Sequence, residues 1–387
     1  MQLNSYYSPL TMLTVVSQSS KLVAEVELPH WNERDIKSMT TDREIVWQAF
    51  AETETAAFDG PARDITIHLP EGYDDCDERY PVFYFHDNSS FDDVHDTLVA
   101  EGLIRPAIAV SVPSPDRTFD YTMSDSRANN RTGGCETYGR FLTERLKPAI
   151  DEQFRTLAGP EDTGVIGCSL GGLISCWLAW RYPDVFGMAG CMSPSLWWND
   201  RQMLSLLQEK LPTTPHRPAF WFCAGAFETT MWHNALAAAK ILKRAGWSEG
   251  IDLAWVHDPQ GYHDSYYWLK RQRDMLGFFL GKSPASASEI SIHKNRELGD
   301  LHLDNPAEAR GAHLFAKVQY GKEFTISAID PNWSSDDADI ISICPDGKIR
   351  PALVGKTIIR ANLGQLTAEL SCESLARPGS MNYLTLR

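Results

Sequence analysis

The sequence contains no run of apolar residues that approaches the roughly 20 needed to cross a bilayer. Its N-terminus has no cationic stretch before the short apolar run Leu10–Val16 and no clear small-residue cleavage site, which argues against a signal peptide. Positive charge is also scarce: with a formal net charge of -15, nucleic acid and anionic membrane surfaces would repel the chain on average. These absences predict a cytoplasmic protein without nucleic-acid or membrane partners.

The sequence also lacks closely spaced pairs of cysteines. The eight cysteines are scattered, none forms a Cys-x-x-Cys pair, and several lie in apolar stretches where a thiol behaves as a small hydrophobe. The sequence has no cluster of metal ligands and no glycine-rich phosphate-binding loop. We therefore expect reduced thiols, no metal and no cofactor, while the oligomeric state stays open.

What the chain does have is length and an ordinary globular composition. Its 387 residues exceed the usual ceiling for a single hydrophobic core, so two domains are expected. Hydrophobic residues make up 43% and charged residues 22%, as in a folded globular protein.

The middle of the chain alternates short apolar runs with amphipathic segments. Such runs are typical of strands buried on both faces, and they span 81–86, 106–112, 164–167, 188–192, 219–225 and 252–257. Helices are expected between them over 138–154, with a kink at Pro148, and over 173–182, 203–210, 233–244 and 266–280. This alternation predicts an α/β domain with a mainly parallel sheet, preceded by antiparallel strands within 44–70.

The pattern changes after the small-residue stretch that begins at Gly281. Short runs with partial alternation follow, and Pro345-Asp346-Gly347 is a good hairpin turn. We expect an N-terminal extension over 1–43, an α/β domain over 44–281, a linker over 282–289 and a β-rich, sandwich-like domain over 290–387.

The most specific local signal is Gly167-Cys168-Ser169-Leu170-Gly171, which lies between a predicted strand and a predicted helix. In a nucleophile elbow the serine occupies a strained turn, and small neighbours are needed because a Cβ would clash there. Ser169 is therefore the candidate nucleophile of an α/β-hydrolase fold. The alternative is a tight glycine-rich turn with an inert serine.

A serine hydroxyl needs a base to accept its proton. His263 follows the last predicted strand and precedes the final helix, where this fold carries its base, and it is preferred to His257 at the strand end. The other histidines considered, read as surface or structural residues, are His86, His95 and His233.

The third catalytic group should lie between the serine and the histidine in sequence, after a strand. Glu228 is the first acid after the run 219–225, and Asp252 and Asp258 are alternatives. The order serine, acid, histidine is that of the α/β-hydrolase fold. Donors for the oxyanion are expected from the backbone N–H of Leu170 and from Asp87 or Asn88 after the strand 81–86.

Seven segments together resemble an esterase family that includes enterochelin (siderophore) esterases, esterase D-type hydrolases, feruloyl esterases and mycolyltransferases. They occur in family order at 63–73, 80–87, 116–121, 167–172, 182–187, 193–198 and 261–268. The enterochelin esterase group is the most similar, through Ser193-Pro-Ser-Leu-Trp-Trp and the histidine-to-tryptophan spacing around His263. The resemblance implies a serine esterase with Ser169 as nucleophile and His263 as base.

The substrate is then a small-molecule carboxylic ester, for which an aromatic or catecholate ester is one candidate. Aromatic acyl groups could meet tryptophans, and anionic groups could meet loop arginines; the candidates are Trp197, Trp198, Trp232, Arg117, Arg127 and Arg131. Packing and solvation are the alternative roles for these side chains. Two other functions stay open, an acyltransferase with the same triad and a non-catalytic binding module.

Overall fold

The computed structural model describes residues 38–40, 44–49, 63–87, 91–123, 133–209, 215–282, 286–294, 313–376 and 382–386. Three predicted site residues, Asn88, Arg127 and Arg131, lie outside these ranges. Within the described residues, no helix has the length and apolar character needed to cross a membrane.

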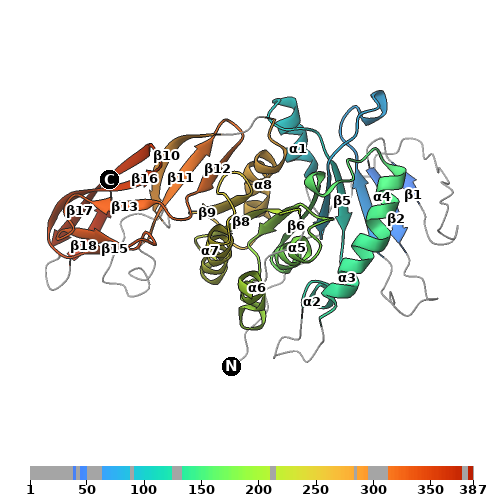
Figure 1. Ribbon diagram of the computed structural model, residues 1–387. Helices are drawn as coiled ribbons and strands as arrows, with labels where there is room; N and C mark the ends of the chain where they lie inside the picture. Colours follow the sequence, from blue (N-terminus) through green and yellow to red (C-terminus); the bar gives the residue numbers. More distant parts are fainter. Residues whose placement is uncertain are drawn as a thin grey trace.

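A nine-stranded sheet forms the centre of the molecule, in the order β1-β2-β3-β5-β4-β6-β7-β8-β9 (Figure 1). The strands are β1 Ser38–Thr40, β2 Glu44–Ala49, β3 Arg63–His68, β4 Val82–His86, β5 Ile108–Val112, β6 Thr163–Cys168, β7 Met188–Met192, β8 Ala219–Gly225 and β9 Leu253–Asp258. Pairing is antiparallel from β1 to β5 through β2 and β3, and parallel among β5, β4, β6, β7, β8 and β9. The predicted α/β architecture, with its initial antiparallel strands, is confirmed.

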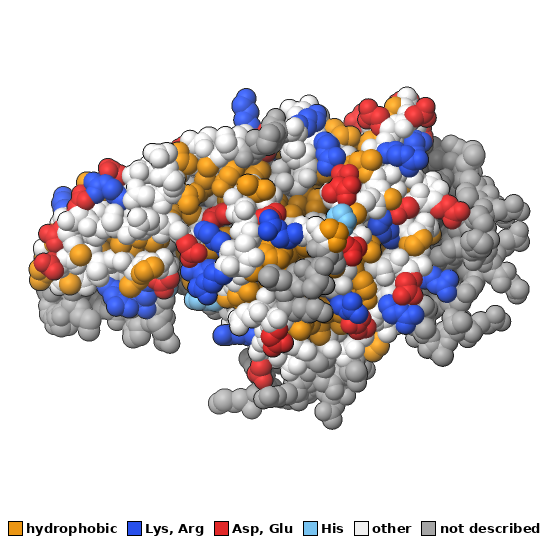
Figure 2. All heavy atoms as spheres, viewed as in Figure 1, with side chains coloured by type: hydrophobic (Ala, Val, Ile, Leu, Met, Phe, Trp, Pro, Cys, Tyr) orange, Lys and Arg blue, Asp and Glu red, His pale blue; other side chains and the backbone are white. Residues whose placement is uncertain are grey.

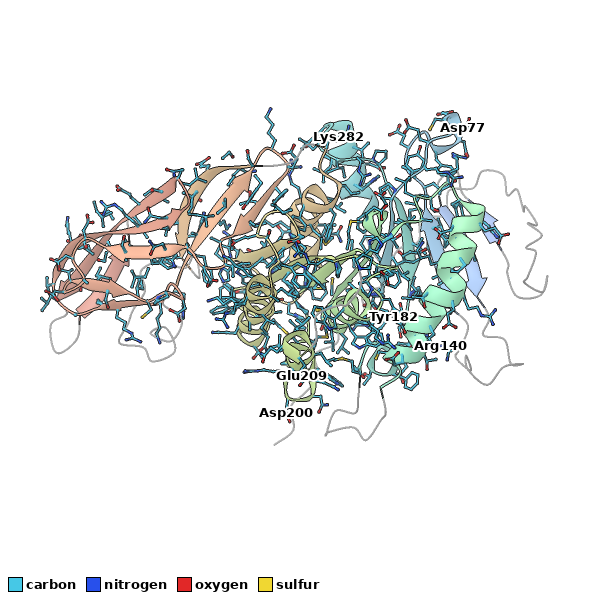
Figure 3. All side chains as sticks on the ribbon, viewed as in Figure 1. Asp77, Arg140, Tyr182, Asp200, Glu209 and Lys282 are labelled. Carbon is cyan, nitrogen blue, oxygen red and sulfur yellow. The ribbon has the colours of Figure 1, made fainter. Side chains whose placement is uncertain are left out.

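Helices cover both faces of this sheet because its strands carry apolar side chains on both sides. Tyr84 of β4 packs with the helices on one face, whereas Phe83 and Phe85 pack with those on the other. The first layer contains α3 Cys135–Phe141, α4 Lys147–Gln153, α5 Leu170–Arg181, α6 Trp198–Glu209 and α7 Thr229–Arg244, and the second α1 Phe91–Ala100 and α8 Ser265–Leu280. Side chains fill the space between the sheet and these layers (Figure 3).

Two helices differ in detail from the predicted ranges. The segment expected as one kinked helix over 138–154 runs as α3, a π-helical turn Leu142–Leu146 and α4, because Pro148 has no N–H to continue the α-helical ladder. The helix expected from Met203 is α6, which is interrupted by positive φ angles at Asn199, Asp200 and Arg201.

The C-terminal part is built of antiparallel β-sheets that lie beside the β9 edge of the central sheet (Figure 1). One sheet contains β10 Ala287–Lys294, β11 Leu314–Tyr320 and β12 Phe324–Ser327; a second contains β13 Asn332–Ser335, β16 Gly355–Leu363, β17 Leu366–Ala376 and β18 Asn382–Leu386. Strands β14 Ile341–Ile343 and β15 Ile349–Pro351 form a hairpin whose turn contains Gly347 at φ 84°. Hydrophobic side chains gather over the region of β10–β12, while acidic and basic side chains intermingle on the same face (Figure 2).

The contact between the two parts is aromatic and buried. The ring of Phe315 on β11 stacks on His257 of β9 with centroids 3.8 Å apart, and it meets Trp232 of α7 edge-on at 5.6 Å. The backbone N–H of His257 donates to Ser327 Oγ at 2.9 Å. These contacts attach the C-terminal sheets to the α/β part of the molecule.

We expect Phe315→Ala to lower the free energy of unfolding by about 3–5 kcal/mol, because it removes a buried ring and leaves a cavity. Urea denaturation of the full chain measures this loss. The matched control is Val354→Ala in the same C-terminal part, where the side chain is 55% exposed and the expected change is within about 0.5 kcal/mol. Equal stability of the Phe315 variant and the wild type would show that this contact does not hold the C-terminal sheets.

Candidate active site

Ser169 occupies a strained turn between a strand and a helix. Strand β6 ends at Cys168, α5 begins at Leu170, and Ser169 between them has φ 61° and ψ -116°. A Cβ on Gly167 would lie 2.5 Å from the carbonyl carbon of Gly171, so the turn requires glycine at that position. The Ser169 N–H donates to Met192 O at 2.9 Å, which ties the turn to β7. This is the geometry expected of a nucleophile elbow.

One chain of hydrogen bonds joins the predicted serine, histidine and glutamate. His263 Nε2 lies 3.1 Å from Ser169 Oγ, and His263 Nδ1 lies 3.0 Å from Glu228 Oε1. The Glu228 side chain is 1% exposed and that of His263 is 38% exposed. With a proton on Nδ1 facing the carboxylate, Nε2 is free to accept the serine proton.

Local structure explains why Glu228 and His263 meet. Glu228 follows β8 and stands at the N-cap of α7, and the Gly225 N–H donates to its Oε2 at 2.5 Å, so the carboxylate is anchored to the strand end. His263 directly precedes Asp264, whose carboxylate caps α8 by accepting from Tyr266 N. Because β8 and β9 are neighbouring parallel strands, both residues reach the same edge of the sheet.

The alternative acids have partners other than His263. Asp258 Oδ2 accepts from Arg271 Nε at 3.1 Å, and Asp252 pairs with Arg217 at 2.5 Å before the start of β9, away from the serine. Among Glu228, Asp252 and Asp258, Glu228 is the acid that contacts His263.

The other histidines are held by different partners. His257 lies in the aromatic contact with the C-terminal sheets, His95 Nε2 accepts from Ala107 N at 2.9 Å, and His233 stacks on Trp232. His86 Nδ1 hydrogen-bonds with Tyr138 Oη at 2.8 Å, and burial lowers the pKa of His86 to about 3. His86 is therefore neutral at physiological pH.

The predicted oxyanion donors are placed unequally. The N–H of Leu170 belongs to the first turn of α5, where backbone donors have no partner within the helix. The N–H of Asp87, at φ 75°, is directed to Val112 O at 3.4 Å, so it is engaged with β5. Asn88, the other candidate in this loop, is not among the described residues.

Arg117 lies beside the elbow, where its guanidinium contacts a carboxylate and a backbone carbonyl. It pairs with Asp87 at 2.9 Å, and its Nη2 donates to the carbonyl of Cys168 at 3.2 Å. Burial raises the pKa of Asp87, and the adjacent Arg117 partly counteracts this. Arg117 therefore joins the loop after β4 to the residue before Ser169.

The three predicted tryptophans have different surroundings. Trp197 is 41% exposed and lies two residues from Ser195, whose Oγ is 3.3 Å from Ser169 Oγ. Trp198 is buried against Trp197. Trp232 is buried in the contact with the C-terminal sheets and is not brought to the serine. Sequence reasoning did not single out Ser195, although it belongs to the Ser193-Pro-Ser segment of the family resemblance.

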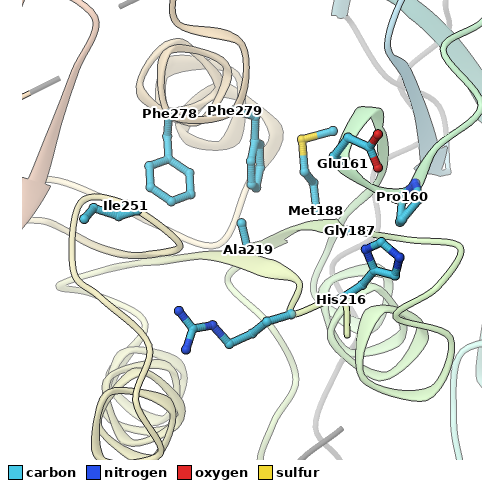
Figure 4. A pocket seen from close by; sticks show the side chains of 10 residues that line it. Pro160, Glu161, Gly187, Met188, His216, Ala219, Ile251, Phe278 and Phe279 are labelled. Carbon is cyan, nitrogen blue, oxygen red and sulfur yellow. The ribbon is translucent and has the colours of Figure 1, made fainter. Parts of the chain in front are cut away.

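A cavity of about 270 Å³ lies at the amino-terminal ends of the central strands (Figure 4). Gly187, Met188 and Ala219, at the starts of β7 and β8, line it together with Phe278 and Phe279 of α8. Ser169 and Glu228 follow the opposite, carboxyl ends of their strands. The cavity and the candidate site therefore lie at opposite ends of the parallel strands.

Comparison with known proteins matches residues 57–273 to the family model described as "Putative esterase". The uncharacterized protein YbbA of Bacillus subtilis (strain 168) is 28% identical over 236 residues, covering 57% of this chain and 94% of YbbA. Ferri-bacillibactin esterase BesA of the same strain is 30% identical over 144 residues, covering 31% of this chain and about half, 49%, of BesA. The solved structure of the siderophore hydrolase EstB from Aspergillus nidulans is similar in fold, with a TM-score of 0.53 at 16% identity over 63% of this chain and 98% of EstB.

Proposed function

Because this chain belongs to the esterase family whose model spans residues 57–273, we propose that it hydrolyses a carboxylic ester through an acyl-enzyme on Ser169. The observation that carries the proposal is the hydrogen-bonded chain from Ser169 Oγ through His263 to the buried Glu228. A serine in that chain can lose its proton to His263 as it attacks, which an isolated serine cannot do at neutral pH.

The reaction has two halves. Ser169 Oγ attacks the ester carbonyl and His263 Nε2 accepts its proton, giving a tetrahedral oxyanion that the N–H of Leu170 stabilises. The imidazolium then gives the proton to the departing alcohol, leaving the acyl group on Ser169. Water, activated by His263, releases the acid and restores the serine.

We propose water as the acceptor of the acyl group. The His263 side chain is 38% exposed, so water reaches the group that must activate it. For the substrate we propose an aromatic ester of the catecholate type. BesA is named as a ferri-bacillibactin esterase and EstB as a siderophore hydrolase, and Trp197 presents an exposed indole two residues from Ser195.

A panel of aryl, alkyl and siderophore-lactone esters tests the function. We expect release of free acid, with kcat/KM highest for esters of aromatic acids. His263→Ala is expected to lower the activity on every ester of the panel, because the base serves both halves of the reaction. The assay is run with and without an added alcohol, and a transferred acyl group in place of free acid would show that the protein is an acyltransferase.

A further inference from the structure

Ser193 lies behind the catalytic glutamate and is the centre of a buried hydrogen-bond network. It is fully buried and has φ 42°, a left-handed conformation that is unfavourable for a residue with a side chain. Its hydroxyl donates to Glu228 Oε2 at 2.8 Å and accepts from Trp268 Nε1 and Arg271 Nη1, each at 3.1 Å. One donor and two acceptors are the full capacity of a hydroxyl.

Arg271 supplies the positive charge of this network. Its side chain is 3% exposed, its Nε donates to Asp258 Oδ2 at 3.1 Å, and its Nη1 lies 3.7 Å from Glu228 Oε2. A Cβ on Gly261 would collide with Arg271 Nη2, so the loop before His263 closes tightly over the guanidinium. Buried carboxylates are costly unless a charge and hydrogen bonds compensate them, and this one guanidinium faces both Glu228 and Asp258.

We propose that Ser193 and Arg271 are positioning residues for the esterase reaction, which fix the Glu228 carboxylate in place and turn a single oxygen, Oε1, toward His263. The inference rests on the proposed function. Oε2 is occupied by Ser193 Oγ and the Gly225 N–H, so Oε1 is left for His263 Nδ1. Trp268 and Arg271 lie three residues apart on one face of α8, and the Trp268 ring also meets His263 edge-on at 5.0 Å.

The charges around Glu228 fix the direction of a pH effect. The titratable or charged groups that face it are His263, Arg271 and, through Arg271, Asp258 and Cys223; burial raises the pKa of Cys223 to about 11, so it stays a neutral thiol. Removing the guanidinium disfavours the Glu228 carboxylate and favours a protonated His263. Both changes move the acidic limb of activity to higher pH. Removing the Asp258 charge acts in the opposite sense.

The test is the second-order rate of Ser169 labelling by a fluorophosphonate, measured against pH for full-length variants. We expect Arg271→Met to label about 100-fold more slowly near neutral pH, with its acidic limb at least about one pH unit higher than in the wild type. Arg271→Lys should recover about tenfold of the loss, because it restores the charge. Asp258→Asn breaks the same ion pair but should not move the limb upward.

Ser193→Gly provides a variant that is compatible with the backbone, since glycine adopts φ 42° without strain while the hydroxyl is lost. We expect about tenfold slower labelling and an upward shift of the limb. Unshifted limbs in Arg271→Met and Ser193→Gly, or an equal upward shift in Asp258→Asn, would overturn the inference and leave Ser169 as the nucleophile. A wild type that is not labelled would instead overturn the proposed function, and this inference with it.

Discussion

Replacing Ser169 with alanine is expected to lower kcat for ester hydrolysis by about 10⁶-fold, the scale of loss when the nucleophile of a serine–histidine–acid unit is removed. Alanine keeps the elbow backbone and deletes only the oxygen that lies 3.1 Å from His263 Nε2. Without it no acyl-enzyme can form. Steady-state hydrolysis of an activated aryl ester measures the loss, and circular dichroism checks that the variant is folded.

Ser195→Ala is the matched control because its hydroxyl lies only 3.3 Å from that of Ser169. It has no contact with His263 among the hydrogen bonds of the described residues, so we expect kcat within about tenfold of the wild type. An active Ser169→Ala protein, or a Ser195→Ala protein that is as inactive as Ser169→Ala, would show that Ser169 is not the nucleophile.

The second large effect is expected for Glu228→Gln, which should lower kcat by about 10⁴-fold. The amide is nearly isosteric with the carboxylate, but it cannot stabilise the imidazolium and permits the wrong tautomer of His263. In the wild type the Glu228 carboxylate accepts hydrogen bonds from Gly225 N–H, Ser193 Oγ–H and His263 Nδ1–H. The measurement is kcat on the same aryl ester across pH.

Two aspartates at the ends of β9, Asp252 and Asp258, serve as controls for Glu228. Asp252→Asn, which removes the partner of Arg217, is expected to leave kcat unchanged. Asp258→Asn is expected to cost no more than about tenfold, because Asp258 meets Arg271 and not His263. A loss in either variant that matches that of Glu228→Gln would remove Glu228 from its assigned role.

The central sheet was predictable because its strands are buried on both faces. The apolar runs at 81–86, 106–112, 164–167, 188–192, 219–225 and 252–257 correspond to β4 through β9. The elbow was predictable for a similar local reason, since Gly167 must avoid the Gly171 backbone within four residues. The position of Pro148 also anticipated an irregular helix, although its form, a π-helical turn, was not anticipated.

The hydrogen-bond network that holds Glu228 could not be predicted, because it depends on contacts between segments that are distant in sequence. Arg271 reaches Ser193 across 78 positions and Ser193 reaches Glu228 across 35. Composition and periodicity carry no information on such contacts. The position of Trp232 could not be predicted either. The sequence made it a candidate for an aromatic acyl pocket, whereas in the fold it packs against His257 and Phe315. Arg117 stays a candidate for contact with an anionic substrate group, and its contacts with Asp87 and the Cys168 carbonyl likewise join segments that are distant in sequence.

The central claim is that Ser169 is a nucleophile activated by His263, and mass analysis after fluorophosphonate treatment tests it most directly. We expect one adduct on the intact chain, located on the peptide that contains Ser169, strongly slowed in His263→Ala and absent in Ser169→Ala. No adduct on the wild-type chain, or an adduct that persists in Ser169→Ala, would contradict the account.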